Sequence, residues 1–176
     1  MAEGRLILGD TLPTITLSLT DGRRMTLPDE IPGRYLALFF YRGVWCGMCR
    51  KHLASYQPRI AELKSLGADV VVASVNTREA VIKMTEENGL GAIPMAYGVT
   101  DEDVAAFHPL FVDEPERGHY IEPMELLVAQ DGIIFGSMYT SGSVGRMGVE
   151  EVLDSLRRRE GRRIDLESAQ VAGVGA

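Results

Sequence analysis

An apolar run at residues 35–41 is followed within a few positions by two cysteines, Cys46 and Cys49, and then by a helical pattern. The run YLALFFY predicts a central strand that is buried on both faces. From residue 47 to residue 66, apolar side chains recur at helical spacing. Cys46 is therefore expected at a helix N-terminus, where free amide N–H groups and the helix dipole favour a thiolate and lower the thiol pKa.

The rest of the chain predicts an α/β fold. An Asp21-Gly22 turn joins expected strands at 14–19 and 23–27 into an N-terminal β-hairpin. A second buried strand at 69–75 precedes a helix capped by Thr77, which gives the strand–helix–strand–helix order of a parallel core. A closing hairpin is expected at 124–138, a surface loop at 111–120, and an amphipathic helix at 149–159. Residues 161–176 are expected to fray.

Length, charge and cysteine content restrict the function. The 176 residues fit one domain that spans residues 1–176. The net charge of −7 argues against nucleic acid or an anionic membrane surface as a partner. No segment reaches the roughly 18 apolar residues of a membrane span, and the N-terminus lacks a signal-peptide pattern, so we expect a cytoplasmic protein. Two cysteines are too few for a structural zinc site, and we expect neither a metal nor a cofactor.

The spacing of the two cysteines indicates redox chemistry. A C-x-x-C pair near a βαβ pattern is typical of thioredoxin-like proteins. In that chemistry Cys46 is the nucleophile, and Cys49, one turn later, is the resolving thiol. The alternative is a pair of buried, inert cysteines that share this spacing by coincidence.

Residues 6–160 resemble the alkyl hydroperoxide reductase / thiol-specific antioxidant (peroxiredoxin-like) family. The segments that carry the resemblance are 9–13, 15–17, 21–22, 39–49, 72–75 and 123–134. The resemblance implies a thioredoxin-like fold with a central mixed sheet flanked by helices, and by analogy a possible homodimer. It also implies that Pro123 is the cis-proline that faces the redox pair in such folds. An ordinary trans proline at the start of a strand is the alternative, and Pro94 is the weaker candidate for the cis residue.

The resemblance covers two activities, and the chain departs from both patterns. Peroxiredoxins carry P-x-x-x-T-x-x-C, but counting back from Cys46 finds Phe39 and Gly43 at the Pro and Thr positions. The position of the family's peroxide-binding arginine holds Pro123. Arg42 either replaces that arginine or has a surface or ion-pairing role.

These departures rank three functional hypotheses. The first is a thiol–disulfide oxidoreductase that uses the cysteine pair, and the second is a peroxiredoxin-like thiol peroxidase that uses the same pair. The third is a redox-sensing binding module with little turnover. The partners implied are a disulfide or peroxide substrate and a thiol electron donor such as thioredoxin or a small thiol.

Thioredoxins also have a buried Asp six residues before the first cysteine, and here that position is Phe40. The proton acceptor for Cys49 therefore stays open between Glu122, His119 and water.

Several neighbours of the pair have two interpretations each. His52 follows Cys49 by three residues and either stabilises a thiolate or lies on the surface of a basic helix start. Trp45 is expected to shield the sulfur and contact substrate, and packing alone is the other explanation. Gly47 and Met48 separate the cysteines, and Met48 is expected to be exposed toward a partner.

Overall fold

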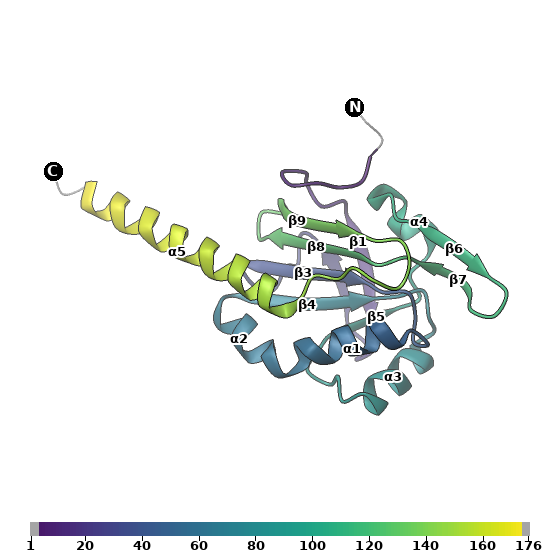
Figure 1. Ribbon diagram of the computed structural model, residues 1–176. Coiled ribbons are helices and arrows are strands. Elements are labelled where there is room, and N and C mark those ends of the chain that lie inside the picture. Colours follow the sequence, from purple (N-terminus) through teal and green to yellow (C-terminus); the bar gives the residue numbers. More distant parts are fainter. Residues whose placement is uncertain (1–3, 174–176) are drawn as a thin grey trace.

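A seven-stranded mixed sheet forms the centre of the computed structural model, which describes residues 4–173 (Figure 1). The strand order is β2-β1-β5-β4-β3-β8-β9, and a separate two-stranded sheet pairs β6 with β7. The strands are β1 (Ile15–Leu19), β2 (Arg24–Leu27), β3 (Tyr35–Phe40), β4 (Ala68–Ala73), β5 (Met95–Tyr97), β6 (Phe111–Glu114), β7 (Gly118–Ile121), β8 (Met124–Ala129) and β9 (Ile134–Tyr139).

The strand β3 lies inside the sheet, as the apolar run predicts. It pairs in parallel with β4 and antiparallel with β8, and all six of its residues are buried. Its side chains alternate between two apolar cores: Leu36, Leu38 and Phe40 enter one, and Ala37 and Phe39 enter the other. The two cysteines belong to the core that receives Phe39.

The helices cover the two faces of the sheet unequally. Helices α1, α2, α3 and α5 contribute to the core on the cysteine side, whereas α4 and η2 contribute to the opposite core. The helical segments are α1 (Gly47–Tyr56), η1 (Gln57–Arg59), α2 (Ile60–Ser65), α3 (Arg78–Glu87), α4 (Asp101–Val104), η2 (Ala105–Phe107) and α5 (Val149–Gly173).

Local sequence signals explain where these helices begin and end. Pro58 lies in η1 and separates α1 from α2, because proline cannot donate the backbone hydrogen bond that a continuous helix needs. Thr77 caps α3 by accepting a hydrogen bond from the Ala80 N–H, as expected. Thr100 and Asp103 form a capping box at the start of α4.

The N-terminal hairpin of β1 and β2 joins the main sheet. Residues Ser18 and Leu19 pair antiparallel with Tyr97 and Ala96 of β5, so the hairpin extends the sheet beyond its parallel strands. The alternating burial of β1 follows the alternation in its sequence.

Residues 111–120, expected as a surface loop, instead form most of the β6–β7 hairpin. Phe111 stacks on His119 with ring centroids 5.1 Å apart, and Tyr120 is buried. The polar residues on the exposed side of this hairpin concealed the strand pattern in the sequence.

The last helix is longer than the sequence pattern predicted. Residues 161–173, expected to fray, continue α5 to Gly173, and this part of the helix projects past the edge of the sheet (Figure 1). Arg163 pairs with Glu160 at 3.0 Å and with Glu167 at 2.7 Å, and such i,i+3 and i,i+4 pairs support an exposed helix. Residues 174–176, also part of that expectation, lie outside the described residues.

Glu160 also ties α5 to the sheet. Its carboxylate accepts hydrogen bonds from the Arg34 guanidinium at 2.9 Å and from the Tyr35 hydroxyl at 2.8 Å.

Of the helices in residues 4–173, none is both long and apolar enough to cross a membrane.

Candidate active site

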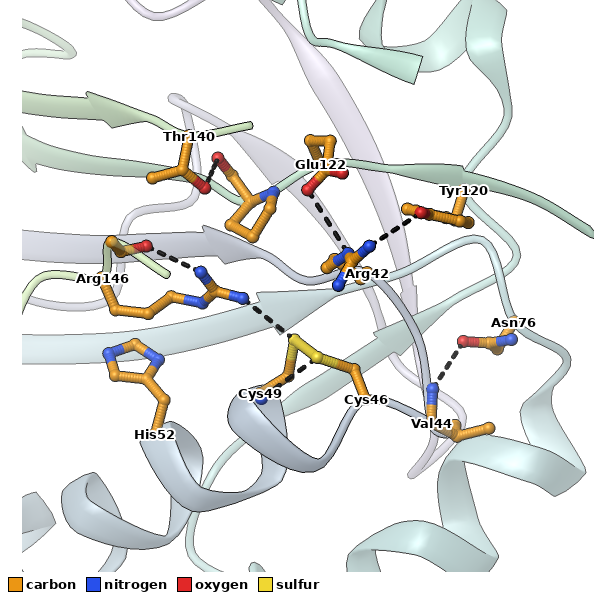
Figure 2. The surroundings of a disulfide bond; sticks show 12 residues. Arg42, Val44, Cys46, Cys49, His52, Asn76, Tyr120, Glu122, Thr140 and Arg146 are labelled. Carbon is orange, nitrogen blue, oxygen red and sulfur yellow. Dashed lines mark hydrogen bonds and ion pairs between the residues drawn. A yellow bond between two sulfur atoms is a disulfide. The ribbon is translucent and has the colours of Figure 1, made fainter. Parts of the chain in front are cut away.

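Cys46 and Cys49 lie where the chain leaves β3 and enters α1, and they form a disulfide (Figure 2). Cys46 is the N-cap of α1, and its sulfur accepts a hydrogen bond from the Cys49 N–H at 3.2 Å. The Cα atoms of the two residues are 5.2 Å apart. Because the first turn of α1 holds no acidic residue, nothing in that turn opposes a thiolate at Cys46.

The two cysteines differ in their position relative to a cavity. Both cysteines are buried, with exposed fractions of 3% for Cys46 and 1% for Cys49. Cys46 lines a cavity of about 470 Å³, and Cys49 is not among its lining residues. The other lining residues are Arg42, Trp45, Gly47, Met48, Arg117, Gly142 and Ser143. A substrate in this cavity would therefore meet Cys46 first.

Trp45 forms one wall of the cavity and packs as well. Its ring lies edge-on to Tyr120 with centroids 5.1 Å apart, and the guanidinium groups of Arg42 and Arg117 lie 5.1 and 4.6 Å from its ring centre. Met48 is exposed, as expected for a residue between the two cysteines. Both interpretations of Trp45 are thus compatible with its position.

Gly43 occupies a position where a side chain does not fit. A Cβ added there would lie 2.7 Å from Nε1 of Trp45 and 3.0 Å from Oδ1 of Asn76. The same Asn76 oxygen accepts a hydrogen bond from the Val44 N–H at 3.0 Å and fixes the loop before Cys46. The threonine of the peroxidase pattern therefore cannot be placed at residue 43 unless Trp45 moves.

We expect Gly43→Thr to lower the free energy of unfolding by about 1–3 kcal/mol, because it overpacks this loop. It should not speed the reaction of the reduced protein with peroxide. Urea unfolding and stopped-flow kinetics measure the two effects. Gly91→Thr is the matched control, since a Cβ there meets no atom within 4 Å. Unchanged stability together with faster peroxide reduction would contradict the steric explanation.

Arg42 is buried on one side of the disulfide (Figure 2). Its Nε lies 3.3 Å from Oε2 of Glu122, and its Nη2 donates a hydrogen bond to the Tyr120 hydroxyl at 2.8 Å. The Tyr120 hydroxyl donates in turn to Glu114 at 2.7 Å. Arg42 is thus ion-paired, but in a buried position that lines the Cys46 cavity rather than at the surface.

A second charged cluster lies on the Cys49 side and was missed by sequence reasoning. Nη2 of Arg146 donates a hydrogen bond to Sγ of Cys49 at 3.3 Å. Beneath it, Glu125 accepts a hydrogen bond from the Met147 N–H at 2.6 Å and lies 3.5 Å from Nδ1 of His52. A lone acid in the otherwise apolar segment 124–129 was the signal that could have indicated this cluster. Arg146 lies in a Gly/Ser-rich loop and gave no such signal.

His52 belongs to this cluster rather than to an exposed surface. One ring nitrogen lies 2.8 Å from the Met147 carbonyl oxygen, and the ring packs between Phe39 and Tyr56 at centroid distances of 5.6 and 5.1 Å. Burial lowers the pKa of His52, which favours the neutral imidazole. The structure gives it no hydrogen bond to either sulfur, so direct stabilisation of a thiolate by His52 is not supported.

The implied cis-proline is not found at residue 123. In the described part of the chain the cis peptide bond is Leu27–Pro28, so Pro123 and Pro94 both follow trans bonds. The chain runs extended from β7 into β8, with the Glu122 N–H bonded to the Leu110 carbonyl and the Pro123 carbonyl accepting from the Thr140 N–H at 3.0 Å. A trans bond suits this direct passage from one strand to the next.

The remaining sequence candidates lie apart from the sulfurs. His119 bridges Asp113 and Asp101, each at 2.8 Å, and joins the β6–β7 hairpin to α4. His108 ends η2 in a left-handed conformation. Phe40 enters the core opposite the cysteines and packs against Phe107, so a carboxylate at that position would not face the pair. Within residues 4–173, no group of three or more His, Cys, Asp or Glu side chains is arranged to hold a metal ion.

Comparison with known proteins places these features in context. A sequence model described as the AhpC/TSA family matches residues 8–135. A peroxiredoxin from Thermotoga petrophila is 26% identical over 159 residues, which cover 88% of this chain and 73% of that protein. A peroxiredoxin from Methanothermobacter thermautotrophicus is 25% identical over 158 residues, covering 86% of this chain and 72% of that protein.

Solved structures show the same fold. AhpC of Mycobacterium tuberculosis superposes with a TM-score of 0.73 at 23% identity, covering 88% of this chain and 93% of that one. Reduced Prx3 of Vibrio vulnificus in complex with hydrogen peroxide gives a TM-score of 0.74 at 20% identity, covering 86% of this chain and 99% of that one. The expectation of a thioredoxin-like α/β fold, with a mixed sheet flanked by helices and an N-terminal hairpin, is confirmed.

Proposed function

Because the chain belongs to the AhpC/TSA family, whose sequence pattern spans residues 8–135, we propose that it is a thiol-dependent peroxidase acting through Cys46 and Cys49. The membership itself makes the protein an enzyme of the oxidoreductase class. The observation that carries the proposal is the position of Cys46 in the cavity, at the N-terminus of α1 and joined to its resolving partner.

The cycle begins with the reduced pair. The Cys46 thiolate attacks one oxygen of a hydroperoxide, the O–O bond breaks, and the alkoxide takes up a proton to leave as an alcohol. Cys46 is then a sulfenic acid. The Cys49 thiolate attacks that sulfur and displaces hydroxide, which becomes water. Two thiols and one hydroperoxide thus yield a disulfide, an alcohol and water, and a thiol donor such as thioredoxin or a small thiol restores the pair.

Groups at the cavity can stabilise the negative charge of the Cys46 thiolate and of the leaving oxygen. The Cys49 N–H, in the first turn of α1, donates a hydrogen bond to the Cys46 sulfur, and Arg42 lines the same cavity as Cys46. Such fixed donors stabilise an anion without rearrangement. Arg42 is the candidate to replace the family's arginine, since Pro123 has no side chain that can bind peroxide.

Thiol–disulfide exchange is the second candidate function. It is favoured by the absence of the family's Pro and Thr at residues 39 and 43, and by the exposed Met48 beside the pair. A soft apolar side chain next to the nucleophile suits contact with a protein substrate.

Stopped-flow mixing of the reduced protein with hydrogen peroxide tests the proposal. Trp45, the single tryptophan, reports the oxidation through its fluorescence. We expect Cys46 to react at least about a hundredfold faster than a free cysteine thiolate, the effect expected of one or more fixed donors at the sulfur. A rate equal to that of the free thiolate, together with rapid reduction of insulin disulfides, would replace the peroxidase by a disulfide reductase.

A further inference from the structure

The Cys49 sulfur has a cationic partner in a buried position. The Arg146 side chain comes from the loop between β9 and α5, and only 9% of its surface is exposed. Its Nη2 donates to Sγ of Cys49 at 3.3 Å, while its Nη1 donates to the Gly145 carbonyl oxygen at 2.7 Å (Figure 2). The guanidinium group thus contacts one of the two sulfurs from the side away from Arg42.

A buried carboxylate partly compensates this charge. Oε1 of Glu125 lies 4.0 Å from Nε of Arg146, and its side chain is 2% exposed. Burial raises the pKa of Glu125 to about 7, although the Met147 N–H and Arg146 oppose that shift. Burial also lowers the pKa of Arg146. The carboxyl group is therefore close to its point of ionisation near neutral pH.

The other groups around Glu125 come from two helices. Helix α1 contributes His52, which burial keeps neutral, and Tyr56, whose pKa burial raises. Helix α5 contributes Glu151, whose charge acts on Tyr56 as that of Glu125 does. Arg146 is also acted on by Arg42, which lowers its pKa, and by Glu122, which raises it. Arg146 is the cation that donates a hydrogen bond to the Cys49 sulfur.

We propose that Arg146 is a catalytic residue for Cys49: it stabilises the Cys49 thiolate that is released when a donor thiol opens the disulfide, and the nearby Glu125 carboxylate offsets part of its charge. The proposal rests on the redox cycle of the pair given above, but it concerns the reduction of the disulfide and not the identity of the oxidant. It concerns the charge that appears on Cys49 and is separate from the choice of proton acceptor between Glu122, His119 and water, because a guanidinium cation cannot accept a proton.

Reduction of the disulfide takes two donor thiolates. A donor thiolate attacks Sγ of Cys46, which lines the cavity, and forms a mixed disulfide with it. The electron pair of the Cys46–Cys49 bond passes to Cys49, which leaves as a thiolate beside the Arg146 guanidinium. A second donor thiolate then attacks the donor sulfur of the mixed disulfide and releases Cys46 as a thiolate. The donor is oxidised to its disulfide, and the pair is reduced.

Arg146→Met tests the proposal through the rate of reduction by dithiothreitol at pH 7, followed by Trp45 fluorescence. We expect this rate to fall about tenfold or more, which is the effect of losing one charge-assisted hydrogen bond at the leaving sulfur. Arg146→Lys should recover part of the loss. Arg157→Met is the matched control, because Arg157 pairs with Glu62 and Asp154 at the surface. Its rate should stay within about twofold of the wild-type rate.

An unchanged rate in Arg146→Met would overturn the proposal, and so would an equal loss in the control. The oxidation of Cys46 by peroxide, measured on the same reduced proteins, keeps the two proposals separate. If the wild-type protein fails to react with peroxide, the proposed peroxidase is wrong, whereas the dithiothreitol comparison still decides the role of Arg146.

The effect of the Glu125 charge on Arg146 and Cys49 is tested by titration of Cys49 in a Cys46→Ser background, with thiolate absorbance at 240 nm as the readout. Arg146→Met should raise the pKa of Cys49, because the cation is gone. Glu125→Gln should lower it, because the carboxylate that competes for Arg146 is gone while the amide oxygen can still accept from Met147. A purely structural role would not shift the two variants in opposite directions, and shifts of the same sign or none would contradict the role of Glu125.

Discussion

Cys46→Ser is expected to reduce turnover with hydroperoxide by about a thousandfold or more, the scale seen when an enzyme loses its nucleophile. The physical reason is access to the nucleophile, since Cys46 lines the cavity and Cys49 is not among its lining residues. Peroxide consumption with dithiothreitol as the donor measures the loss. The variant should keep its fold, because the thiol and the hydroxyl are similar in size.

Cys49→Ser is the paired variant and should behave differently. It should lose turnover as well, yet its Cys46 should still react with one equivalent of peroxide within about threefold of the wild-type rate, since the donors around Cys46 remain. Dimedone should then trap a sulfenic acid, and mass spectrometry should locate it on Cys46. If Cys46→Ser retains the fast oxidation and Cys49→Ser loses it, the assignment of nucleophile and resolving thiol is reversed.

Phe39→Ala should lower the free energy of unfolding by about 3–5 kcal/mol, the usual cost of removing a large aromatic side chain from a core. Phe39 is 1% exposed and lies edge-on to Tyr56 with ring centroids 5.2 Å apart. Its loss leaves a cavity between β3 and α1, directly beneath the helix that carries the cysteines. Urea unfolding followed by circular dichroism measures the change.

Phe111→Ala provides the comparison for this prediction. Phe111 is only partly buried, on the small β6–β7 sheet, so its truncation should cost about 1–2 kcal/mol. Equal losses in the two variants would show that Phe39 does not support α1 more than an edge aromatic supports its hairpin. The proline of the peroxidase pattern at residue 39 is thus replaced by a residue with a packing role.

The sequence allowed the central fold to be predicted because its signals were local. The run at 35–41 predicted β3, the closing hairpin expected at 124–138 corresponds to β8 and β9, and Thr77 marked the start of α3. The continuation of α5 past Gly161 was missed because the residues there are polar and then small, which favours a frayed tail. Ion pairs of Arg163 with Glu160 and Glu167 support the helix instead. The β6–β7 hairpin was missed because its polar side chains conceal the alternation.

The candidate site also has a part that local sequence signals predict and a part that they do not. Cys46 and Cys49 are three positions apart in sequence, and their placement follows from one strand and one helix. The Arg146–Glu125 cluster joins a loop to a strand 21 residues earlier, and only the packing of β8 against α1 brings it to Cys49. The trans bond at Pro123 likewise depends on how β7 leads into β8, which no local motif specifies.

Because Cys46 of the disulfide lines a cavity, the shape of that cavity restricts which thiols can reduce the protein. A donor sulfur that attacks Cys46 must enter the cavity beside Trp45, because Cys46 lines that cavity and Cys49 does not. A donor whose sulfur projects from its surroundings suits this requirement, whether it is a small thiol or a protein with a protruding cysteine. The walls around Cys46 would then decide which donors can supply electrons, independently of how strongly each donor reduces.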